Sequence, residues 1–151
     1  MRNLFAGLIL VFAVSLTPVA PGHGEEPPDT LDGQWEIVGM VYKGEAQKFD
    51  GPNGGTMAIK GRELVKKYPS WDGEGVRTEI TLRPSKEPKE IDLRFPEVKD
   101  LLPATQHLGI YKLEGETLTI VLAQSDQERP KQFDARKDSK LTSYTLKRTK
   151  K

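Results

Sequence analysis

The chain has 151 residues, a length that suits a single domain. It contains no cysteine, which excludes disulfide bonds, iron–sulfur clusters and thiol catalysis. Its 23 basic and 22 acidic residues leave a net charge of +1, and this balance argues against a dedicated nucleic-acid binder, which usually carries a basic stripe.

The first 24 residues have the pattern of a signal peptide. Arg2 supplies a short positive start, and residues 4–16 form an uncharged apolar run shorter than the roughly 20 residues of a membrane span. Cleavage is expected after Ala20 or Gly24, and the alternative is an uncleaved membrane anchor. Residues 25–30 are predicted to form a Pro- and Glu-rich linker. We therefore expect an exported domain over residues 31–151, periplasmic or secreted, without stable membrane insertion after cleavage.

From residue 31 onward, short segments of β-branched and aromatic residues alternate with turns. The clearest is 76–82, where the even-numbered, mainly apolar residues share one face and polar residues occupy the other. Residues 114–116 are a tight hairpin signal, and no segment is a convincing amphipathic helix. The pattern predicts strands at residues 34–43, 56–60, 63–68, 76–82, 91–95, 108–113, 117–123, 131–135 and 141–148.

Many short strands joined by short turns predict an antiparallel meander. Such a meander forms a sandwich or a closed up-and-down barrel, and closure removes exposed strand edges. The expected fold class is all-β, a small antiparallel up-and-down barrel. The first and last strands of such a barrel are neighbours, so we expect Trp35 to plug one end with the Arg148 guanidinium stacked on its outer face.

Gly33-x-Trp35 together with Arg148 resembles the lipocalin signature. Further motifs follow in chain order: PSK at 84–86, PKEIDL at 88–93, GIYKLEGETL at 109–118, RP at 129–130 with Phe133, and LKR at 146–148. Over residues 31–148 this order is similar to an uncharacterised domain family of planctomycete bacteria that is described as lipocalin-like. The resemblance implies a small, often exported β-barrel and brings no catalytic residue. Glu116 and Val121 depart from the family, which has Asp and often Cys there.

Patterns for catalysis and metal binding are weak. His107 is the only histidine after the linker, and a lone histidine without suitable partners builds no metal site, so we interpret it as structural or solvated, with a general base as the alternative. The Gly-rich segment 51–55 lacks the residues of a phosphate loop. We expect no cofactor, no metal and no nucleic acid, and we interpret the basic C-terminal end as a solvated tail. Four acids are expected on the solvated face of strands rather than as a catalytic pair: Glu79, Glu90, Asp92 and Glu114.

Two functional hypotheses remain. The first is a non-enzymatic barrel that binds a small apolar or amphipathic molecule, since an eight-stranded barrel has room for side chains or one small ligand. The second is a filled barrel that acts through its outer surface as a protein-interaction or structural module of the cell envelope. A cavity favours the first, and a packed interior with an exposed apolar patch favours the second. The predicted ligand-lining residues are Tyr42, Ile80, Tyr111 and Ile120. The residues predicted to face inward are Trp35, Ile37, Met57, Ile59, Ile80, Leu93, Leu118, Ile120 and Leu122.

Overall fold

The computed structural model describes residues 30–49, 51–70, 72–97, 103–135 and 140–149. The predicted signal peptide and all but the last residue of the linker lie outside these ranges. The elements are β1 (Gly33–Tyr42), β2 (Glu45–Lys48), the 3-10 helix η1 (Gly51–Gly54), β3 (Thr56–Lys60), β4 (Glu63–Lys67), β5 (Val76–Arg83), β6 (Glu90–Phe95), β7 (Thr105–Glu114), β8 (Thr117–Ala123) and β9 (Leu141–Arg148).

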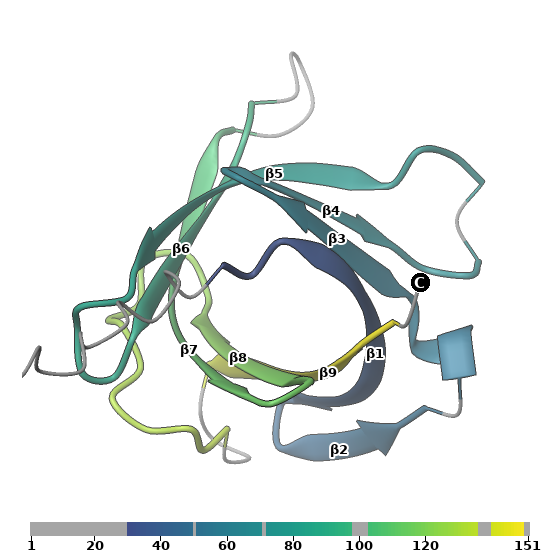
Figure 1. The fold of residues 1–151 in the computed structure, drawn as a ribbon. Coiled ribbons are helices and arrows are strands. Elements are labelled where there is room, and N and C mark those ends of the chain that lie inside the picture. Colours follow the sequence, from purple (N-terminus) through teal and green to yellow (C-terminus); the bar gives the residue numbers. More distant parts are fainter. Residues whose placement is uncertain (1–29, 50, 71, 98–102, 136–139, 150–151) are drawn as a thin grey trace, which may run out of the picture.

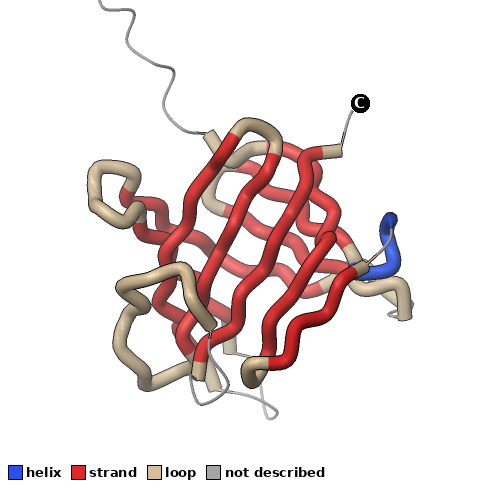
Figure 2. Tube along the Cα trace, turned by 90° about the horizontal axis from the view of Figure 1, so that it is seen from below, coloured by secondary structure: helices blue, strands red, loops and turns tan. Residues whose placement is uncertain are grey.

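Eight of these strands form a closed antiparallel barrel. The order around it is β1-β3-β4-β5-β6-β7-β8-β9, and β9 pairs back onto β1 to close the ring (Figure 1). The remaining strand, β2, pairs only with the second half of β1 and lies outside the ring. Turned by 90°, the strands form the wall of the barrel and loops lie at both ends (Figure 2). The predicted all-β, up-and-down antiparallel fold is confirmed.

Helices contribute little to the described part of the chain. The single helix found there is the short η1, and none of the described residues belong to a helix long and apolar enough to cross a membrane.

The strand predictions agree closely with the structure at most positions. The bounds of β3, β8 and β9 are those predicted, and β7 begins three residues earlier, at Thr105 rather than Leu108. The predicted strand at 131–135 is wrong, because this segment is part of the loop between β8 and β9. The ring centre of Phe133 lies 5.5 Å from the Lys112 Nζ of β7, so the loop packs on the outside of the barrel instead of joining the sheet.

The short strand β2 was not predicted. Its sequence, EAQK, has no apolar alternation to signal a strand, and all four of its residues are exposed. It forms because Lys43 and Gly44 both adopt a positive φ, which suits a two-residue turn between antiparallel strands.

The barrel interior holds one hydrophobic core. All the residues predicted to face inward are buried members of this core, because alternate residues of each strand point to the same side. Ile110 and Val121 have the opposite orientation and are nevertheless fully buried. The loop after β8 lies on that outer side, where the Arg129 Nη1 donates a hydrogen bond of 2.7 Å to the carbonyl of Gly109.

Trp35 closes one end of the barrel. Its side chain is fully buried, and its Nε1 donates a hydrogen bond of 3.0 Å to the carbonyl of Leu31. Arg148 pairs with Trp35 in the β1–β9 register and places its Cζ 4.2 Å from the Trp35 ring centre. The Arg148 Nη1 also donates to the carbonyl of Asp32 at 2.6 Å. The two residues predicted as a barrel-end pair therefore lie side by side, and the chain entering β1 completes the closure.

Candidate functional site

A cavity of about 460 Å³ lies at the opposite end of the barrel. Tyr42, the last residue of β1, and Thr142, near the start of β9, both line it, whereas Trp35 and Arg148 lie at the other ends of these two strands. The volume falls within the range of roughly 300–1,000 Å³ found for small-molecule sites. The lining residues are Tyr42, Met57, Leu64, Lys66, Thr78, Leu93, Phe95, His107, Leu122, Gln124, Ser125, Thr142 and Tyr144.

The cavity wall has an apolar part and a polar part. Met57, Leu64, Leu93 and Leu122 are buried members of the core, so the inner wall of the cavity continues the hydrophobic interior. Phe95 adds a further apolar ring, and the other residues bring hydroxyl, amide, imidazole and ammonium groups from β1, β4, β5, β7, β9 and the start of the loop after β8. This division suits a molecule with an apolar body and a polar group, which is the usual composition of a ligand pocket.

A β-bulge in β1 directs Tyr42 to the cavity. The β1–β9 register runs through Trp35 and Ile37, skips one residue at Val38, and resumes at Gly39. The extra residue shifts the alternation, so that Met40 and then Tyr42 continue the inward-facing row. Without the bulge, Tyr42 would face away from the barrel axis.

His107 is held in the cavity wall by contacts on both ring nitrogens. Its Nδ1 lies 3.0 Å from the carbonyl oxygen of Ala123, and its Nε2 lies 3.4 Å from the Ser125 Oγ. Because a carbonyl oxygen only accepts, Nδ1 carries the proton and Nε2 is the nitrogen that faces Ser125. The ring also packs edge-on against Phe95, with ring centres 5.1 Å apart. His107 thus joins the end of β8 to the start of β7.

Lys66 faces the cavity from β4. It follows Leu64 by two residues, so both share the inward-facing row of the strand. Its Nζ lies 5.1 Å from the ring centre of Tyr68 and 5.4 Å from that of Tyr144. Burial, together with the neighbouring Tyr68, raises the pKa of the Tyr144 hydroxyl, so Tyr144 stays neutral and able to donate.

The four predicted ligand-lining residues lie at two different depths along the barrel axis, and only one of them reaches the cavity. Tyr42 lines the cavity and is exposed, at 42%. Ile80, Tyr111 and Ile120 lie in the packed core, each 1% exposed, and none of them lines the cavity. Lys66, Ser125 and Thr142 were missed. The signal for Lys66 was present, since a lysine two residues after an apolar strand residue shares its face.

Tyr111 gives a testable consequence of this packing. Its hydroxyl is buried without a hydrogen-bond partner in the described part of the chain, and burial raises its pKa. An unpaired buried hydroxyl costs about 1–3 kcal/mol, so Tyr111→Phe should raise the free energy of unfolding by about 1 kcal/mol in urea denaturation. Tyr144→Phe is the control and should bring no gain, because the Tyr144 Oη lies 3.5 Å from the Lys66 Nζ. A Tyr111→Phe protein less stable than wild type would contradict the packing described here.

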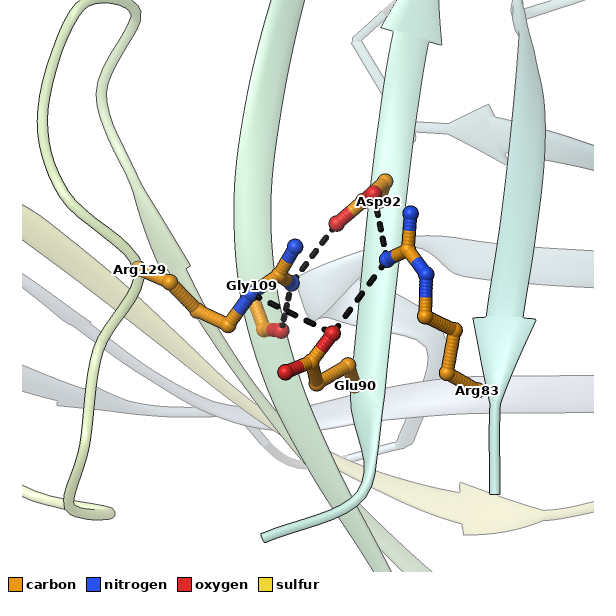
Figure 3. A network of polar contacts seen from close by, with 5 residues as sticks. All are labelled: Arg83, Glu90, Asp92, Gly109 and Arg129. Atoms are coloured by element: carbon orange, nitrogen blue, oxygen red, sulfur yellow. Dashed lines mark hydrogen bonds and ion pairs between the residues drawn. The ribbon is translucent and has the colours of Figure 1, made fainter. Parts of the chain in front are cut away.

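A second polar cluster lies on the outer face of the barrel (Figure 3). Asp92 of β6 lies 2.7 Å from the Arg83 Nη1 of β5 and 2.6 Å from the Arg129 Nη1 of the loop after β8. Glu90 lies within 3.5 Å of the same two arginines. The prediction that Asp92 is solvated is wrong: it faces outward as expected, but Arg129 covers it and leaves its side chain 6% exposed.

The arginines determine the charge state of Asp92. Burial alone raises the pKa of a carboxyl group, but the hydrogen bonds and charges of Arg129 and Arg83 outweigh it, and the net effect is a lowered pKa. Both arginines are therefore paired with an ionised carboxylate. The cluster holds the loop after β8 against the sheet, and its arginines and carboxylates form ion pairs with one another.

No metal site is found in the described ranges, where no three His, Asp or Glu side chains come together. Comparisons of the chain with family models, with curated proteins and with solved structures gave no match.

Proposed function

We propose that this protein is an exported binding module that takes a small apolar or amphipathic molecule into the cavity at the open end of its barrel. The observation that carries the proposal is the cavity of about 460 Å³ opposite the end sealed by Trp35 and Arg148. A barrel closed at one end and hollow at the other offers one entry and an apolar inner wall. Export is proposed from the N-terminal pattern of Arg2 and the apolar run at residues 4–16.

The exposure of hydrophobic side chains favours the cavity as the binding site over a docking face on the outside of the barrel. In the described ranges, Tyr42 is the one large hydrophobic side chain that is exposed, and it stands at the mouth of the cavity. A protein-interaction module that works through an apolar patch would expose several such residues together. The envelope-interaction hypothesis becomes the better one if no small molecule binds.

The proposal is tested with N-phenylnaphthylamine, an uncharged dye that fluoresces in apolar surroundings. We expect saturable binding to one site and a rise in melting temperature that grows with dye concentration, because a ligand that binds only the folded state stabilises it. Thr142→Trp places a large ring at the cavity mouth and should abolish binding.

Lys147→Trp is the matched control. Lys147 lies on the same strand but is exposed on the outer side, so the dye should bind this variant as it binds wild type. Binding that survives Thr142→Trp, or a lack of saturable binding to the wild-type protein, would contradict the proposal.

A further inference from the structure

Among the described residues that line the cavity, Lys66 is the only one with a fixed charge, and none of them is an aspartate or a glutamate. In the described part of the chain, no carboxylate lies within ion-pair distance of the Lys66 Nζ. A cation that faces a partly enclosed, low-dielectric space without a neutralising partner makes that space electrically positive.

The tyrosines around Lys66 leave part of its binding capacity unused. An ammonium group has three N–H donors, and the Tyr144 Oη takes one of them at 3.5 Å. Tyr68 and Tyr144 present their ring faces to the Lys66 Nζ. The rings attract its positive charge but take up none of its N–H donors in a conventional hydrogen bond. Lys66 is thereby positioned in the cavity wall with donors available to a bound group.

We infer that the cavity takes an amphipathic anion whose carboxylate or sulfonate binds beside Lys66. Its apolar part then lies against Met57, Leu93 and Leu122, which form the inner wall. Neutral donors from Gln124 and Thr142 line the same cavity and are suited to the remaining oxygens of the anion. The inference rests on the proposed function, because it names the class of ligand for that same cavity.

The test uses three competitors that share one alkyl chain and differ only in their head group: decanoate, decanol and decylamine. Each is titrated against protein loaded with N-phenylnaphthylamine. We expect decanoate to displace the dye with a dissociation constant about five to ten times lower than that of decanol, the effect of one partly exposed, charge-assisted hydrogen bond. Decylamine should bind more weakly than decanol, because its charge repels that of Lys66. Added salt should weaken the binding of decanoate and leave the binding of decanol unchanged.

Two variants assign the effect to Lys66. In Lys66→Met the side chain stays unbranched and nearly as long but loses its charge, so decanoate and decanol should bind about equally. Lys67→Met removes the same charge from the next residue, which is exposed on the outer side, and should keep the preference for decanoate. Equal binding of decanoate and decanol to wild type, or a decanoate preference that survives Lys66→Met, overturns the inference while leaving the binding function in place. If neither the dye nor any competitor binds saturably, the proposed function fails together with it.

Discussion

Trp35→Ala should lower the free energy of unfolding by about 3–5 kcal/mol, the usual range for deleting a buried large aromatic side chain. Trp35 is fully buried, lies in the core between the chain before β1 and the end of β9, and satisfies its indole N–H with the carbonyl of Leu31. The substitution removes that bond and leaves an empty space at the sealed end of the barrel. Urea denaturation followed by circular dichroism measures the change.

Arg148→Ala is the companion variant and should lower the free energy of unfolding by less, about 1–2 kcal/mol. It removes the guanidinium above the indole ring and the hydrogen bond to Asp32, but it opens no cavity in the core. If Arg148→Ala destabilised the protein as much as Trp35→Ala, burial of the indole would not be the main contribution at this end.

The second large effect is expected at Asp92. Asp92→Ala should destabilise the protein by about 2–4 kcal/mol, because it leaves Arg129 partly buried without its closest carboxylate. Arg129 also bonds to the carbonyl of Gly109, so its displacement should loosen the loop after β8 from the outer face of the sheet. Glu79→Ala is the control. Glu79 forms an ion pair with Arg62 in which both side chains are well exposed, and its loss should cost less than about 1 kcal/mol.

The contribution of Asp92 should also depend on pH. Its pKa in the folded protein is lowered from the ordinary value of 3.8, so the folded state favours the ionised form. This stabilisation is fully present above pH 3.8 and is lost as the pH falls through the lowered value. The stability difference between wild type and Asp92→Asn should therefore be constant near neutral pH and shrink in acid. A difference that grew with acid would contradict the ion pairing.

The fold was largely predictable because strand alternation reports which side chains face the core. The even-numbered residues of 76–82 follow this rule, and burial agrees with it. In 117–123 the inward-facing Leu118, Ile120 and Leu122 follow it too, although Val121 and Ala123 between and after them are also buried. The rule failed where apolar residues have another role. Phe133 packs on the outside of β7 from a loop, while all four residues of β2 are exposed and give no periodic signal.

The site was less predictable, because alternation gives the face of a residue but not its depth along the barrel axis. Ile80, Tyr111 and Ile120 face inward as expected, yet they lie in the packed core below the cavity. Depth depends on the register of all the strands, including the bulge at Val38 in β1, and no local pattern reports it. The burial of Asp92 depends likewise on Arg129, which comes from a distant loop.

The most direct test of the proposed function is to map where N-phenylnaphthylamine binds, by following backbone amide signals in a nuclear magnetic resonance titration. We expect large, saturable shifts at residues that line the cavity, including Leu93, His107 and Leu122, and little change in the hairpin between β7 and β8 at the Trp35 end. Shifts that concentrate around Trp35 and Arg148, or on the outer face of the sheet, would show that the cavity is not the binding site.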